Sequence, residues 1–144
     1  MNREQQLKHL EQAWDILSKS FEGLSYESMT EPGVTGDWSV KDILGHITTW
    51  DEKILGKLTA LMEGQRAPRF PAINRFNAEQ VDLKRDMKLP QVLKELSYIH
   101  KMVMEFAERM PETHFTTETS FRNKSEHYRQ HADSIMAWRK AHES

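Results

Sequence analysis

Apolar side chains recur at steps of three and four along most of the chain, and this spacing constrains the fold more than any other feature. The first set consists of Leu7, Leu10, Trp14, Leu17 and Phe21. Side chains with this spacing form one stripe on an α-helix, because a helix completes a turn about every 3.6 residues. The spacing therefore predicts a helix over residues 3–22, ended by a glycine at position 23.

A second apolar stripe follows a segment rich in glycine. Residues 23–38 contain three glycines and a proline, and we expect them to form a long connection. Ser39 is predicted to cap the next helix, because Asp42 stands three residues later and completes a variant capping box. The stripe then continues to Gly64. Its members are Ile43, Ile47, Trp50, Ile54, Leu58 and Leu61.

The rest of the chain alternates between loops and helical patterns. Residues 65–72 hold two prolines and two arginines and predict a loop, followed by a short helix around residues 73–81. A proline suits the first turn of the next long helix, predicted over residues 90–110. A polar loop over residues 112–120 then leads into a last helix over residues 122–141. The apolar face of that helix holds Tyr128, Ile135 and Trp138.

These elements together predict the fold class. No segment alternates between apolar and polar residues long enough to indicate a β-strand, and the chain has no internal repeat. Four long amphipathic helices favour an all-α four-helix bundle with a long crossover connection and a short extra helix. A length of 144 residues suits a single domain over residues 1–144.

Composition limits the function classes. A formal net charge of −2 provides no global basic field, so we expect no nucleic-acid partner. The absence of cysteine excludes disulfides, thiolate ligands and a cysteine nucleophile. No apolar stretch approaches the roughly 20 residues that span a bilayer, and the charged N-terminus lacks the apolar core of a signal peptide. The sequence therefore predicts a cytoplasmic protein with no membrane partner.

Two histidines one helical turn apart, His127 and His131, are the first candidates for chemistry. Residues four apart share one face of a helix, so both imidazoles can bind a common ion. His131 lies within the predicted apolar stripe, where an imidazole without a partner would lower stability. The alternative is that both histidines are partly exposed and form hydrogen bonds with neighbours or water. Spacing alone favours this second interpretation.

His46 adds a third imidazole, on the second predicted helix. A bundle can bring facing helices together so that three imidazoles converge in its interior. Three nitrogen ligands that leave coordination positions open are typical of a catalytic metal site, since structural zinc sites are closed by four ligands. Periodicity alone does not show that the helices carrying these histidines are neighbours.

The motifs around these histidines resemble those of a known family. The segment GDWSVKDILGH at residues 36–46, followed by WD at 50–51, resembles the G-x-W-S-x-K-D-x-L-x-H signature of the DinB-like superfamily. The segment RFNA at residues 75–78 is similar to its x-F-N-A segment. HYRQH at residues 127–131, with Ile135 and Trp138 after it, is similar to its closing H-Y-x-x-H…I…W pattern. The superfamily includes YfiT-type metal-dependent hydrolases and thiol-dependent transferases.

The resemblance covers nearly the whole chain and has direct implications. It implies the four-helix bundle of the family, often assembled as a homodimer. It implies that His46, His127 and His131 hold a divalent metal ion, for which zinc, nickel and iron are the candidates. It also implies a metal-dependent enzyme that acts on a small electrophilic molecule as a thiol-dependent S-transferase or a hydrolase. A low-molecular-weight thiol is a cosubstrate of some members.

Four other residues are candidates for the surroundings of the site. Asp42 could accept a hydrogen bond from a ligand, although its place in the sequence equally suits helix capping. His100 could be a fourth ligand or a proton shuttle, although such a histidine more often lies at the edge of a core. Trp50 and Asn77 could line a pocket, although a core tryptophan and a helix-start asparagine are common. The remaining histidines, expected to face solvent, are His9, His114 and His142.

The sequence leaves two further function classes open. One is a non-catalytic protein that binds small molecules and protects against reactive compounds. The other is a helical dimerisation module whose histidines hold no metal. The catalytic residues of an enzyme with this sequence stay unknown at this stage.

Overall fold

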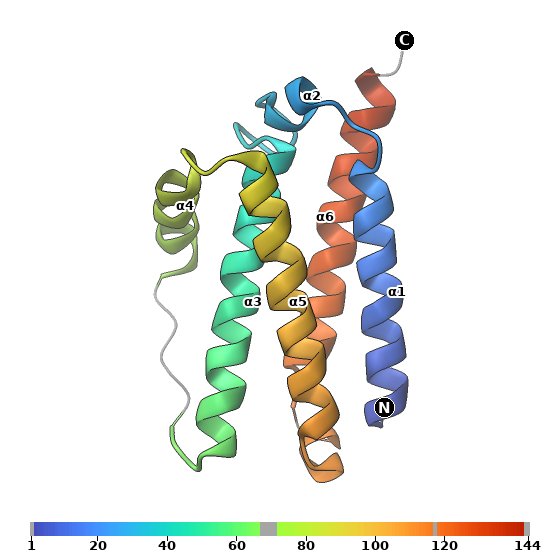
Figure 1. The fold of residues 1–144 in the computed structure, drawn as a ribbon, viewed down its shortest axis with the longest axis vertical. Coiled ribbons are helices and arrows are strands. Elements are labelled where there is room, and N and C mark those ends of the chain that lie inside the picture. The colour runs from blue at the N-terminus through green and yellow to red at the C-terminus, as the bar shows by residue number, and fades with distance from the viewer. Residues whose placement is uncertain (1, 67–71, 117, 143–144) are drawn as a thin grey trace. The chain divides into compact units, whose positions relative to one another are not determined.

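A computed structural model describes residues 2–66, 72–116 and 118–142 (Figure 1). These residues form six α-helices and one 3-10 helix, and their only extended pairing is an isolated bridge between Thr35 and Trp38. The chain divides into two compact units, Met1–Ile43 with Pro111–Ser144, and Leu44–Met110. None of the described helices has both the length and the apolar character that crossing a membrane requires. The single-domain assignment stays a prediction.

The first unit is built around two long helices, α1 (Arg3–Phe21) and α6 (Ser120–His142), which lie side by side (Figure 1). Helix α1 contributes an inward row that includes Leu10 and Leu17, and α6 contributes Tyr128 and Ile135. All four side chains are fully buried. The unit also contains α2 (Tyr26–Thr30), η1 (Glu112–Thr116) and the first turn of α3 (Val40–Met62).

Side-chain caps explain where α1 begins and ends. The Asn2 side chain accepts from the Gln5 amide at 2.9 Å, and the Gln5 side chain accepts from the Asn2 amide at 3.1 Å. This capping box satisfies two amides that have no partner within the helix. At the other end, Arg139 of α6 donates to the carbonyls of Ser20 and Glu22, at 3.3 and 2.7 Å. The last turn of α1 is thereby tied to α6.

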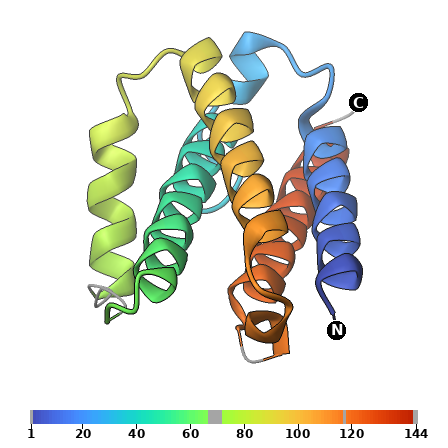
Figure 2. The same cartoon turned by 60° about the horizontal axis from the view of Figure 1, so that its bottom comes forward.

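The second unit holds the rest of α3, α4 (Ile73–Lys84) and α5 (Leu89–Arg109). Helix α5 starts with a proline in its first turn, where the missing N–H removes no helical hydrogen bond. Its buried face includes Val92, Leu96, His100 and Val103. Helix α4 is the short extra helix, and it lies alongside α3 (Figure 2).

The helices confirm most of the expected boundaries. The helix predicted over residues 3–22 is α1, and the one predicted over residues 122–141 is α6, which begins two residues earlier. The predicted capping box of α3 is also present. Ser39 Oγ accepts from the Asp42 amide at 3.1 Å, and Asp42 Oδ2 accepts from the Ser39 amide at 3.0 Å.

Two of the predicted loops differ from the structure. The connection over residues 23–38 contains α2, whose first turn is capped by Ser25, with Oγ 3.1 Å from the Ser28 amide. The loop over residues 112–120 contains η1. Both helices are five residues long, too short to show an apolar stripe. The loop predicted over residues 65–72 lies mostly outside the described residues.

Candidate metal centre

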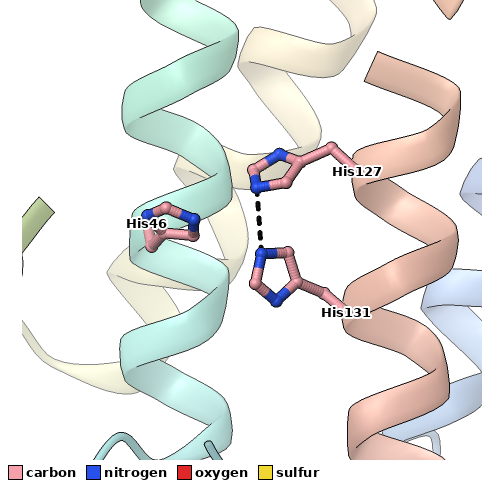
Figure 3. Close-up of side chains that lie close together, drawn as sticks. All are labelled: His46, His127 and His131. Carbon is pink, nitrogen blue, oxygen red and sulfur yellow. Dashed lines mark hydrogen bonds between the residues drawn. The ribbon is translucent and has the colours of Figure 1, made fainter. Parts of the chain in front are cut away.

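Helix α6 presents His127 and His131 on one face, one turn apart. Their Nε2 atoms lie 2.9 Å apart, and their rings meet edge to face with centroids 4.5 Å apart (Figure 3). Both side chains are half-buried. The expectation that helical spacing directs both imidazoles to a common point is met by this geometry.

Burial keeps both imidazoles uncharged. The pKa of His127 is lowered from 6.5 to about 4, mainly by burial and further by the positive charge of Lys124. The pKa of His131 is lowered from 6.5 to about 3, again mainly by burial and then by His127. Both rings are therefore neutral at pH 7, and each keeps a nitrogen lone pair that can accept a proton or bind a cation.

His46, from α3, is the third histidine of the group. It is 7% exposed, and one ring nitrogen from each of the three histidines lies within 4.8 Å of the other two (Figure 3). Among the described residues, no other set of histidine and acidic side chains converges in this way. A cluster of nitrogen donors without a carboxylate suits a divalent transition metal better than calcium or magnesium.

One buried charged residue beside the histidines, Lys124, was not predicted from the sequence. Lys124 is 1% exposed, its ammonium group donates to the Tyr128 hydroxyl, and it lies 4.0 Å from the centre of that ring. Tyr128 in turn meets the Trp14 ring, with centroids 5.6 Å apart. Helical spacing could have predicted the burial of Lys124, because this residue lies on the same face of α6 as His127, His131 and the buried apolar stripe.

Trp50 and Asn77, both named as candidates for a pocket wall, are bonded to each other. The Trp50 indole N–H donates to Asn77 Oδ1 at 2.7 Å. The ring of Phe76 meets the Trp50 ring edge to face, with centroids 5.6 Å apart. Trp50 lies one turn after His46 on α3, so α4 contacts this helix close to the third histidine.

The other candidates take different places. Asp42 serves in the capping box of α3, which is the structural alternative given for it. His100 is buried on α5, at 7% exposure, but it does not belong to the histidine group. His9 and His142 are exposed as expected, whereas His114 is half-buried.

The solved structures that resemble this chain include those of two proteins, ClbS and DfsB. The colibactin self-resistance protein ClbS, crystallised in complex with double-stranded DNA, matches with a TM-score of 0.82 and 16% identity over 96% of both chains. The sibling lethal factor precursor DfsB matches with a TM-score of 0.83 and 13% identity, over 98% of this chain and 96% of its own. No curated protein matches the sequence. These likenesses confirm the predicted all-α fold class.

The ClbS complex contradicts one prediction. Nucleic acid was excluded as a partner because the formal net charge is −2. That sum covers the whole chain and does not report where basic side chains gather, although local phosphate contacts determine DNA affinity. A protein of this fold was crystallised with double-stranded DNA, so the exclusion was wrong.

The family comparison spans almost all of the sequence. A model of the DinB superfamily matches residues 9–143, a range that includes His46, His127 and His131. It also includes the motifs on which the resemblance was based. The resemblance is thereby confirmed, and the chain belongs to the DinB superfamily.

Proposed function

We propose that the protein is a metal-dependent enzyme in which His46, His127 and His131 hold one divalent ion. Its substrate is a small electrophilic molecule, and the reaction is thiol-dependent S-transfer or hydrolysis. The observation that carries this proposal is the convergence of three ring nitrogens within 4.8 Å. Membership in the DinB superfamily supports it, because the three histidines stand where the family motifs place metal ligands.

The donor set fits a transition metal. Two nitrogens bound tetrahedrally to zinc, each at about 2.0–2.1 Å, lie about 3.3 Å apart. The 2.9 Å separation of the His127 and His131 Nε2 atoms and the 4.8 Å limit of the group bracket this distance. Ligating imidazoles must be unprotonated, and the lowered pKa values of both α6 histidines meet that condition at pH 7. Zinc, nickel and iron(II) all accept imidazole nitrogens.

The proposed chemistry follows from a metal ion with three histidine ligands and open coordination positions. A bound divalent ion polarises a carbonyl group or lowers the pKa of a coordinated water or thiol. His46, His127 and His131 would hold that ion, and the lowered pKa values of His127 and His131 keep these two rings neutral at pH 7. Trp50, fixed by Asn77, lies one turn from His46. Because the chain has no cysteine, an S-transfer reaction takes its sulfur from an external low-molecular-weight thiol.

Metal analysis of protein purified without a histidine tag tests the site. We expect close to one equivalent of divalent metal after reconstitution at pH 7. His131→Ala should lose it, whereas His9→Ala, an exposed histidine on α1, should retain it. Wild-type protein that binds less than about a tenth of an equivalent, or His131→Ala with full content, would refute the site.

Turnover assays separate the two reaction classes from a second candidate function. The metal-loaded protein is incubated with a panel of electrophiles, with and without low-molecular-weight thiols. Loss of the electrophile only with thiol indicates S-transfer, and loss without thiol indicates hydrolysis. Stoichiometric recovery of unchanged electrophile favours a binding and protection protein, a candidate supported by the fold shared with the self-resistance protein ClbS.

Double-stranded DNA belongs in the same panel because ClbS was crystallised with it. Fluorescence anisotropy with a labelled duplex at two salt concentrations gives the readout. An affinity that falls steeply with salt identifies contacts to the phosphate backbone. Homodimer assembly, which sedimentation velocity measures, and a cytoplasmic location stay predictions.

A further inference from the structure

Helix α4 has little apolar contact to hold it in place. Of its 12 residues only Val81 is buried, while Ile73 and Leu83 are 59% and 74% exposed. No side chain caps its first turn. An isolated helix of this length is unstable in water, so its position depends on what it contacts.

Polar contacts from α4 reach α3 on either side of His46. The Lys84 ammonium donates to the carbonyl of Gly45, at 3.3 Å, and lies 3.9 Å from the Glu52 carboxylate. Gly45 immediately precedes His46. A Cβ at Gly45 would lie 3.5 Å from Lys84 Cδ, so the lysine stem rests directly against the glycine backbone. Lys84 thus adds a contact from α4 to the peptide unit that leads into His46, whose carbonyl also accepts from the Thr49 hydroxyl at 3.1 Å.

The second contact lies one turn further along α3. Asn77 accepts the indole N–H of Trp50 at 2.7 Å, and Phe76 meets the same ring edge to face. Long side chains of a helix point back toward its N-terminus, over the preceding turn. The preceding turn of α3 carries His46. Trp50, whose ring Asn77 fixes, is therefore directed toward the turn that carries His46.

We propose that Asn77 and Lys84 are positioning residues for His46, through Trp50 and the Gly45 carbonyl respectively. This inference rests on the proposed function, in which His46 is a metal ligand. A ligand must be held within about 0.5 Å of its productive position. Outer contacts that orient a ligand change metal affinity by roughly 10- to 100-fold when they are lost. Helix α4 thus sets metal affinity without supplying a ligand.

Paired substitutions test the proposal. Asn77→Leu removes the acceptor for Trp50, whereas Asn77→Asp keeps one. Lys84→Met removes the ammonium donor to the Gly45 carbonyl and leaves the Thr49 hydroxyl, which donates to the same carbonyl at 3.1 Å, whereas Lys84→Arg keeps a cationic donor. Arg75→Met is the matched control, because Arg75 lies on α4, is 84% exposed and pairs with Glu79 of the same helix. Cobalt(II) affinity is measured from the visible absorption of the bound ion. Thermal unfolding of the metal-free proteins reports stability separately.

We expect Asn77→Leu and Lys84→Met to weaken cobalt(II) binding roughly 10-fold each. Asn77→Asp, Lys84→Arg and the Arg75→Met control should stay within about threefold of wild type. In the metal-free protein, the imidazole NMR signals of His46, identified by their absence in His46→Gln, should shift in the first two variants only. A purely structural role for α4 would lower the unfolding temperature and leave cobalt(II) affinity unchanged.

The two readouts separate failure of this inference from failure of the proposed function. If wild-type protein binds cobalt(II) and the variants bind it equally well, the positioning role is wrong and the metal site stands. If wild-type protein binds no cobalt(II), the metal site is wrong, and the metal-free NMR signals then decide the positioning role. Unchanged His46 signals in Asn77→Leu and Lys84→Met would overturn it.

Discussion

Acidification of the metal-free protein should destabilise it through His127 and His131. Their pKa values in the folded chain, about 4 and about 3, lie below the ordinary value of 6.5. Well above pH 6.5 both rings are neutral in the folded and the unfolded chain, so these histidines do not change the free energy of unfolding with pH. As the pH falls below 6.5, the unfolded chain binds protons that the folded chain does not, so the free energy of unfolding falls.

The magnitude follows from the same values. Each neutral histidine lowers the free energy of unfolding by about 1.4 kcal/mol for every pH unit below 6.5. For His127 the decline ends near pH 4, and for His131 near pH 3. Between pH 7 and pH 5 the two histidines together lower the free energy of unfolding by about 4 kcal/mol. A domain is typically stable by about 5–15 kcal/mol, so this loss is a large fraction of the total.

Urea unfolding at pH 7, 6 and 5, followed by circular dichroism in the presence of a chelator, measures this loss. The control is the double variant His127→Asn/His131→Asn, which removes both titrating rings and keeps a polar amide at each position. Subtracting its decline from that of wild type cancels the contribution of carboxylates and other histidines. We expect the difference to be about 4 kcal/mol. An equal decline in the two proteins would show that burial does not hold these imidazoles neutral.

Four further substitutions probe the helices and the site. Gly56→Ala should raise the free energy of unfolding by about 1 kcal/mol, because an added Cβ inside α3 meets no atom within 4 Å. Gly64→Ala, at φ +71°, should instead lower it in the same urea assay. Ser39→Ala should lower it by about 1 kcal/mol, through loss of the α3 cap. Lys124→Met should raise the pKa of His127 toward, but not to, 6.5 in an NMR titration, because burial is the larger cause.

The helical part of the fold was predictable because its determinants are local. Apolar residues three and four apart mark the long helices, and the Ser39 and Asp42 pair marks the start of α3. The set of buried residues on α1 still differs from the predicted apolar stripe. Its buried side chains include Gln6 and Ser20, whereas Leu7 and Phe21 lie at the edge. Neighbouring helices decide which positions of a broad apolar face are covered, and sequence spacing does not contain that information.

The site was predictable only in part. The spacing of His127 and His131 is a local property of one helix, and their proximity followed from it. His46 comes from a different helix, so only the family motifs connected it with them. The burial of Lys124 was not predicted because lysine side chains are almost always exposed to solvent. The hydrogen bond between Trp50 and Asn77 depends on how α4 lies along α3, which no periodicity specifies.

Burial of the histidines links the acid sensitivity of the fold to its proposed chemistry. A proton and a metal ion compete for the same nitrogen lone pair, so a ring that is hard to protonate stays available as a ligand. Burial lowers the pKa of both His127 and His131, and the charge of Lys124 lowers that of His127 further. A buried ammonium group is a poor source of stability, since apolar replacements are often as stable or more so. Lys124 therefore acts on the charge state of His127 alone, as an addition to the larger effect of burial.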